Sequence, residues 1–201
     1  MARSSDSACK RTRILTATLE VLARQGFHGF SMKQLADEAG VATGTIYLYF
    51  QDKEALIESL HLELIQRIAA ELFYQHDPEA PAKTQFALFA RNYWRYCMSE
   101  KNVVLSKAQF DHLPPEVLDS QRQDARRIFA PLLAFFEQCR AKRILKDLPD
   151  EVLISLGIEP LLHLAAKAHL GRAVVDPPLF EKVLAACWDA IATSGSGALE
   201  V

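Results

Sequence analysis

The sequence predicts an all-α protein, and two observations support this fold class. Apolar residues recur at every third or fourth position along most of the chain, as Leu56, Leu60, Leu64 and Ile68 do, and this is the period of an amphipathic helix. Half of the 201 residues are hydrophobic, a share that suffices for a sizeable core. A chain of this length forms one large or two small domains.

The N-terminal residues 1–9 are small and polar, so we expect a disordered arm there. A helix with an apolar stripe follows. Lys10, Arg11 and Arg13 stand at its start, where positive charge opposes the helix dipole. Two interpretations of these cations stay open: they contact DNA phosphates, or they form a solvated helix start.

Two short helices are predicted between residues 31 and 49. Ser31 is a favourable N-cap, Gln34 completes a capping box, and Gly40 supplies a left-handed stop. Thr43 is then expected to cap a very short second helix that ends near Tyr49. Two such helices across a tight glycine-containing turn make a helix-turn-helix, which places its second helix in the DNA major groove.

This stretch resembles the DNA-binding domain of the TetR family of bacterial one-component repressors. The resemblance rests on the run GVATGTIYLYF, with the residues around it: Gly40 to Phe50, Asp52-Lys53-Glu54, Leu56, Arg13-Ile14-Leu15, Gly26-Phe27 and Ser31. It covers roughly the first quarter of the chain; the remainder agrees in length and helical character alone. The resemblance implies a three-helix helix-turn-helix domain over residues 10–54. A long helix joins it to a C-terminal helical ligand-binding and dimerisation domain over 55–193, followed by a tail, 194–201.

The expected DNA contacts lie on and beside the recognition helix. Threonines can hydrogen-bond to bases or phosphates, and a glycine in the first turn lets the helix approach the groove closely. The resemblance implies phosphate contacts by the two tyrosines and the lysine. Leu48, where the family often has a polar side chain, can meet a thymine methyl group. The candidates are Ser31, Lys33, Thr43, Gly44, Thr45, Tyr47, Leu48, Tyr49 and Lys53.

The body of the chain is predicted to be helical throughout. The helix from Asp52 runs to about Tyr74, and the resemblance implies that a pendulum-like shift of this helix transmits a signal. A later helix should run from Glu116 to about Arg143, with Pro131 kinking it. Such a kink opens space between helices and so favours a pocket.

A small-molecule site in the body is a hypothesis, and any of its residues can instead belong to the core. Aromatic side chains favour an apolar or aromatic effector, and three polar residues are possible anchors. The candidates are Phe89, Tyr93, Trp94, Phe110, His112, Phe129, Phe136, Glu159 and His163.

The last two predicted helices, 149–170 and 178–193, are unusually apolar. The final helix carries two adjacent stripes: Leu179, Val183, Ala186 and Ala190 form one, and Phe180, Leu184, Cys187 and Ile191 form the other. One stripe can face the protein's own core and leave the other for a partner. A homodimer through a four-helix interface is therefore expected, as the resemblance also implies.

Several other functions are disfavoured by the sequence. The four cysteines are widely scattered without zinc-like spacing, so no metal or cofactor is expected. No phosphate loop, nucleophile elbow or acid/base pair indicates an enzyme. Polar interruptions in the stretch 152–170 argue against a membrane span, and the polar N-terminus does not resemble a signal peptide. We therefore expect a cytoplasmic protein.

The charge distribution agrees with DNA binding at one end. The net charge is −2, but the first 50 residues contain six basic and four acidic residues, so they carry +2 and the remainder −4. The leading interpretation is a homodimeric repressor that leaves a palindromic operator when an effector binds. The alternative is a ligand-independent or protein-responsive regulator, and an activator role stays open. The operator, effector and regulated genes cannot be read from the sequence.

Overall fold

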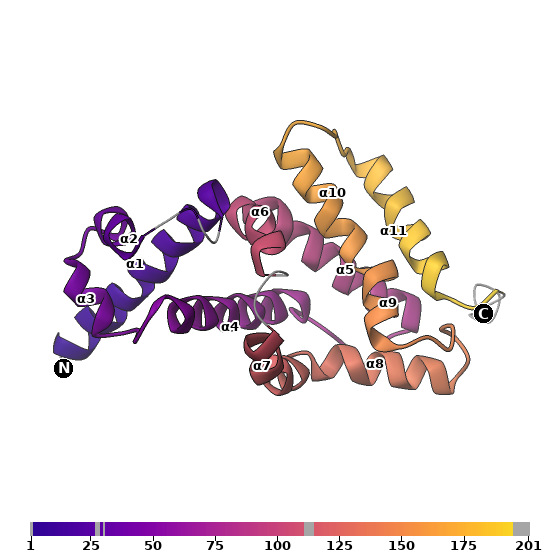
Figure 1. The fold of residues 1–201 in the computed structure, drawn as a ribbon. Coiled ribbons are helices and arrows are strands. Elements are labelled where there is room, and N and C mark those ends of the chain that lie inside the picture. Colours follow the sequence, from indigo (N-terminus) through magenta and orange to yellow (C-terminus); the bar gives the residue numbers. More distant parts are fainter. Residues whose placement is uncertain (1, 27–28, 30, 111–114, 195–201) are drawn as a thin grey trace. The chain divides into compact units, whose positions relative to one another are not determined.

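The computed structural model describes residues 2–26, 29, 31–110 and 115–194, and these residues contain helices but no β-strand (Figure 1). The described helices are α1 Ala2–Gln25, α2 Met32–Ala39, α3 Thr43–Tyr47, α4 Lys53–Leu72, α5 Ala82–Ser99, α6 Lys101–Phe110, α7 Pro115–Ile128, α8 Ala130–Ala141, α9 Asp150–Gly157, α10 Glu159–His169 and α11 Pro177–Ile191. The predicted all-α fold is confirmed. No helix in these ranges is both long and apolar enough to cross a membrane.

The chain divides into two compact units. Unit 1 comprises residues 1–65 and 102–123, and unit 2 comprises residues 66–101 and 124–201. The first boundary falls inside α4, eleven residues beyond the expected boundary at residue 54. The reason is that the first turns of α4 belong to the core of unit 1, where Leu56, Ile57 and Leu60 are buried. His61 of α4 also stacks on Phe110 of α6, with 5.2 Å between the ring centroids.

Unit 1 is built on α1, whose apolar stripe packs against α2. Ile14, Leu15, Val21 and Leu22 of this stripe are buried. The helix begins at Ala2 and so includes residues for which the sequence predicts a disordered arm. Residues 2–24 contain no glycine or proline, so nothing in the local backbone stops the helix earlier.

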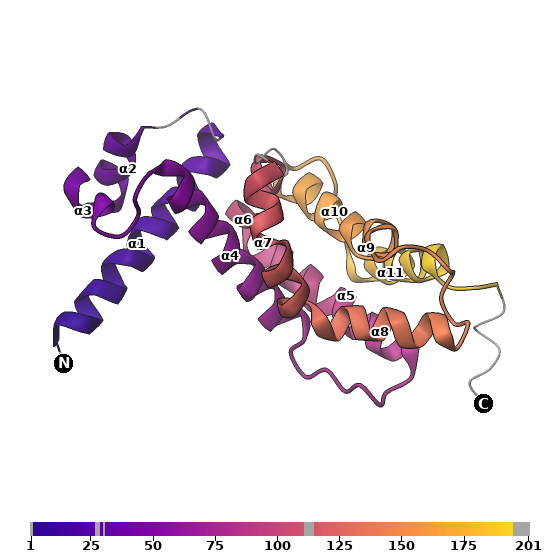
Figure 2. The same ribbon diagram turned by 60° about the horizontal axis from the view of Figure 1, so that its bottom comes forward.

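Unit 2 is organised around α5. Phe86, Phe89 and Ala90 of α5 are fully buried, and α10 and α11 pack on this helix while α9 packs on both of them (Figures 1 and 2). Edge-to-face contacts extend the core, because the Phe89 ring lies 5.7 Å from Phe73 and 5.5 Å from Phe135. Aromatic pairs in this geometry add stabilisation beyond their buried area.

Two expected helices are in fact divided by prolines. The helix predicted over residues 116–143 is broken at Phe129 into α7 and α8, and Pro131 lies in the first turn of α8. The stretch 149–170 is likewise broken at Ile158 into α9 and α10, with Pro160 in the first turn of α10. Proline lacks the backbone donor that a helix interior needs, but it suits a first turn. Each proline therefore starts a helix here instead of kinking one.

Candidate nucleic-acid interface

The helix-turn-helix begins with a capping box at the start of α2. The Ser31 hydroxyl accepts from the backbone N–H of Gln34 at 3.2 Å, and the Ser31 N–H donates to the Gln34 side-chain oxygen at 2.9 Å. Gly40 ends α2 in the left-handed conformation, with φ of 61°. Both features agree with the prediction, and they fix the two ends of the first helix of the motif.

Arg13 of α1 holds the turn between the two helices. Its Nη2 donates to the carbonyl oxygen of Ala39 at 2.7 Å and to that of Gly40 at 3.1 Å. A cation at this place satisfies carbonyls that the helix end leaves unpaired and complements the negative end of the helix dipole. This contact gives Arg13 a structural role within the motif that the sequence did not predict, and the two interpretations of the cations stay predictions.

Arg11 is also engaged inside unit 1. Its Nη1 donates to Glu63 Oε2 of α4 at 3.2 Å, and its guanidinium lies 5.6 Å from the centroid of the Phe50 ring. The Arg11–Glu63 ion pair links α1 to α4, and the Arg11 guanidinium lies over the Phe50 ring at the end of the motif. The sequence did not reveal these contacts, because the partners lie 52 residues apart.

The recognition helix α3 has only five residues. Its N-cap is Ala42, which makes no side-chain capping bond, and Thr43 is its first helical residue. The prediction that Thr43 caps the helix is therefore wrong by one position. Ile46 and Phe50 are buried beneath the helix, so the packing of these two residues fixes its orientation.

The residues that α3 leaves uncovered lie on both sides of the buried Ile46 in the chain. Leu48 is 82% exposed and Tyr47 is 52% exposed. Gly44 is exposed as well, and a Cβ atom added there would meet no atom within 4 Å. Thr43 and Thr45 are half-buried, and so is Tyr49. We call Thr43, Gly44, Thr45, Tyr47 and Leu48 the recognition surface.

The remaining DNA-contact candidates lie at helix starts in the same unit. Asp52 caps α4 by accepting from the backbone N–H of Ala55 at 2.8 Å, which leaves Lys53 as the first residue of α4. Partial burial lowers the pKa of Lys53, and the charge of Glu54 opposes this effect. Ser31 and Lys33 are exposed at the start of α2. The nine candidates thus lie at the start of α2, along and just after α3, and at the start of α4, all in unit 1.

The predicted ligand residues are dispersed. Phe89 and Phe136 are fully buried in the packed core of unit 2, and Trp94 stacks on Phe180 with 5.2 Å between centroids. Tyr93 is buried, while Phe129 is half-buried with its ring 6.4 Å from Phe73. Phe110 belongs to unit 1. His112 lies outside the described residues.

The two polar anchors on α10 are occupied locally. Glu159 accepts from the Ser155 hydroxyl at 2.9 Å, and His163 Nδ1 lies 3.0 Å from the backbone oxygen of Glu159. In the same unit, burial raises the pKa of the Cys97 thiol to about 12 and that of the Cys139 thiol to about 11. The predicted ligand residues in the described part of unit 2 therefore mainly make packing contacts with other side chains.

Fold and site together define a helix-turn-helix DNA-binding protein with a helical body. The family described as "Bacterial regulatory proteins, tetR family" matches residues 14–60, and that described as "Tetracyclin repressor-like, C-terminal domain" matches residues 81–192. The chain therefore belongs to the TetR family of transcriptional regulators. It is a DNA-binding regulator and not an enzyme, as its relatives indicate.

Three relatives illustrate this membership. An uncharacterized HTH-type transcriptional regulator of Haemophilus influenzae is 27% identical over 181 residues, covering 89% of this chain and 94% of that protein. A fatty acid metabolism regulator protein of Bacillus subtilis is 32% identical over 96 residues, or 48% of this chain and 50% of that protein. A solved TetR family protein of Vibrio parahaemolyticus has a TM-score of 0.77 at 34% identity, covering 92% of this chain and 100% of that one.

Proposed function

We propose that the protein is a homodimeric repressor that binds an inverted-repeat operator and leaves it when a small apolar or aromatic molecule binds. The observation that carries the DNA-binding part is the recognition surface: Gly44, Tyr47 and Leu48 are exposed on and just after a short helix whose Ile46 is buried. The second helix of a helix-turn-helix needs such an uncovered face to enter the major groove. A protein that acts on DNA in this way works in the cytoplasm.

Each candidate has a role in this proposal. Thr43, Thr45 and Leu48 contact base edges, with the leucine side chain against a thymine methyl group, and Gly44 allows the close approach. The other candidates contact phosphates, which sets the position of the protein on the duplex. They are Ser31, Lys33, Tyr47, Tyr49 and Lys53. Two such surfaces require half-sites roughly 34–36 Å apart, or somewhat more.

The two faces of α11 support a dimer through α10 and α11. Phe180, Leu184, Cys187 and Ile191 of one stripe are buried within the chain. In the other stripe Leu179 is 41% exposed and Ala186 is exposed, while Val183 and Ala190 are half-buried. An apolar stripe that the chain itself does not cover suits a two-fold copy, since the same residues then meet across the axis.

The effector is proposed to be apolar because of the aromatic character of unit 2. The Bacillus subtilis relative is named a fatty acid metabolism regulator, and fatty acids have apolar chains. An effector releases the operator only if it binds the DNA-free conformation more tightly. We propose that the effector opens the core around Phe89 and Phe136, which is closed in this structure.

A second candidate function is favoured by this same packing. Because Phe89 and Phe136 are fully buried, the core requires no ligand to be complete. A ligand-independent or protein-responsive regulator, repressor or activator, fits a filled core. A thermal-shift screen with apolar compounds separates the candidates: a saturable rise in Tm supports the effector, and no shift supports the second candidate.

The test of DNA binding is selection from a pool of random duplexes. We expect recovery of an inverted repeat, and a Tyr47→Phe or Lys53→Gln variant should bind it several-fold more weakly because each loses a phosphate contact. Tyr74→Phe is a matched control, since Tyr74 is also exposed but lies in unit 2. Failure of the folded protein to enrich any sequence, or equal losses in the control, would contradict the proposal.

A further inference from the structure

The recognition surface lies in a stretch of the chain that has no charged or amide side chain. Residues 41–50 read VATGTIYLYF, and their only polar side-chain atoms are the hydroxyl groups of two threonines and two tyrosines. Much apolar carbon is open to a partner, because Leu48 is 82% exposed and the N-cap residue Ala42 is exposed as well. The side chains that α3 and its flanks offer to a DNA groove therefore carry methyl and hydroxyl groups.

Several charged and amide side chains around this stretch are engaged inside unit 1. Arg13 donates to two backbone carbonyl oxygens in the turn before α3. Gln34 Oε1 and Asp52 Oδ1 each accept from a backbone N–H at a helix start. The first amide after the stretch, Gln51, is exposed, but it lies beyond the buried Phe50 and outside α3. Base reading by α3 itself therefore falls to the recognition surface.

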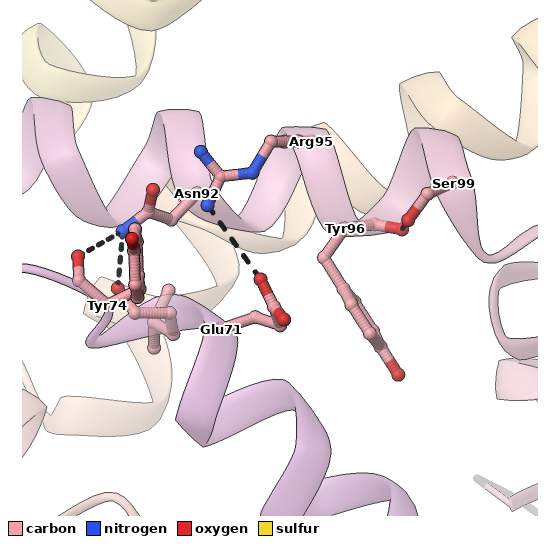
Figure 3. Close-up of polar contacts among 7 residues, drawn as sticks. Glu71, Tyr74, Asn92, Arg95, Tyr96 and Ser99 are labelled. Carbon is pink, nitrogen blue, oxygen red and sulfur yellow. Dashed lines mark hydrogen bonds and ion pairs between the residues drawn. The ribbon is translucent and has the colours of Figure 1, made fainter.

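An exposed tyrosine of unit 2 has a different setting. Tyr74 is 55% exposed, and the Arg95 guanidinium lies 5.8 Å from the centroid of its ring. Arg95 Nη2 in turn lies 3.7 Å from Glu71 Oε2 (Figure 3). Both units thus expose an aromatic ring, and the recognition surface differs by lying in a stretch without charged side chains.

The major groove offers few specific features to a surface of this composition. Guanine is read by paired hydrogen bonds from arginine or lysine, adenine by asparagine or glutamine, and cytosine by a carboxylate. A threonine or tyrosine hydroxyl can both donate and accept, so a single hydrogen bond from it distinguishes the bases poorly. Apolar carbon has one specific partner in this groove, which is the 5-methyl group of thymine.

We propose that the recognition surface selects its operator mainly through the 5-methyl groups of pyrimidines. Leu48 makes the main contact, and the methyl groups of the half-buried Thr43 and Thr45 extend it along the helix. Gly44 lies between the two threonines and keeps the approach open, because even an added Cβ atom would meet nothing within 4 Å. This inference rests on the DNA-binding part of the proposed function and adds to it the chemical class of the bases that are read.

Such a surface distinguishes bases that differ by one methyl group. Uracil pairs as thymine does but lacks the methyl group, whereas 5-methylcytosine carries a methyl group at the same ring position as thymine. The surface should therefore bind thymine in preference to uracil, and 5-methylcytosine in preference to cytosine. One buried methyl group corresponds to about a fourfold change in affinity, hence to roughly tenfold or more when both half-sites of an inverted repeat are altered.

The test uses the full-length protein and the inverted repeat recovered by selection. Each thymine is replaced in turn by deoxyuridine at the symmetry-related positions of both half-sites, and the affinity is measured by fluorescence anisotropy. We expect at least one replacement to weaken binding roughly tenfold. At that position a 5-methylcytosine–guanine pair should bind at least about threefold more tightly than a cytosine–guanine pair.

Leu48→Ala identifies the methyl group that this side chain contacts. In this variant, uracil should cost less than about twofold at one of the sensitive positions, because the side chain that covered the methyl group has been removed. Val174→Ala is the matched control, since Val174 is 90% exposed but lies in unit 2. The control variant should keep the full loss at every sensitive position.

Three results would overturn the inference: no uracil replacement costs more than about twofold, 5-methylcytosine binds no better than cytosine, or Leu48→Ala keeps every loss of the unaltered protein. Recognition would then depend on hydroxyl groups or on DNA shape. Failure to recover any duplex is a different result, because it overturns operator binding and this inference together. A selected operator that is insensitive to these methyl groups overturns this inference alone.

Discussion

Large apolar or aromatic side chains occur among both the predicted DNA contacts and the predicted ligand contacts, but they differ in how far they are exposed. In unit 1, Tyr47 and Leu48 are 52% and 82% exposed. In unit 2, Phe89 and Phe136 are fully buried. The short helix α3 is too small to bury more than one face, whereas α5 is covered by α10 and α11. Exposure, and not aromatic character, separates a contact surface from a core.

The largest expected effect is that of Phe136→Ala. Loss of a fully buried phenylalanine side chain should lower the free energy of unfolding by about 3–5 kcal/mol, because it removes apolar burial and leaves a cavity. Urea denaturation measures this. A loss below about 1 kcal/mol would show that the side chain lines a ligand space instead of packing in the core.

Gly40→Ala should cost about 1–2 kcal/mol. The residue has φ of 61°, where a Cβ atom is strained, and that atom would lie 2.9 Å from Arg13 Nη2. Gly44→Ala is the matched control within the same motif. Its Cβ meets no atom within 4 Å, and alanine in a helix should stabilise by roughly 0.5–1 kcal/mol. Equal effects of the two variants in urea denaturation would contradict this account.

Tyr96→Phe should raise the free energy of unfolding by about 1 kcal/mol. The substitution keeps the ring and removes a buried hydroxyl that has no partner. Tyr74→Phe, at an exposed tyrosine, should leave stability unchanged. A fall in the stability of Tyr96→Phe would mean that the hydroxyl is satisfied in solution.

Leu48→Ala should have the smallest effect on stability, within about 0.5 kcal/mol, because the side chain is 82% exposed. Affinity for the selected operator should nevertheless fall. Thermal melts and binding isotherms of the variant test this directly. A loss of stability with unchanged operator affinity would mean that Leu48 contributes to packing and not to DNA contact.

The sequence predicted the local features of the helix-turn-helix well. The capping box at Ser31 and the left-handed stop at Gly40 depend on residues within one or two turns, so their pattern is visible in a single stretch. The nine DNA-contact candidates stay predictions, although they all lie on or beside α2, α3 and the start of α4 in one unit.

Features that depend on distant residues were missed. The carbonyl contacts of Arg13 reach across 26 and 27 residues, and the contact of Arg11 with Glu63 reaches across 52 residues. The breaks at Phe129 and Ile158 were missed for another reason: proline at a helix start and proline at a kink look alike in a periodic apolar pattern.

The Arg13–Gly40 contact also limits how this motif can evolve. The backbone φ of 61° strains any side chain at position 40, and a Cβ atom there would also lie 2.9 Å from the Arg13 guanidinium, which can move away only by giving up its carbonyl contacts. Removal of the arginine leaves the carbonyl oxygens of Ala39 and Gly40 without this donor. Among relatives we therefore expect glycine to be retained at position 40 whichever residue occupies position 13, because the left-handed backbone sets this requirement.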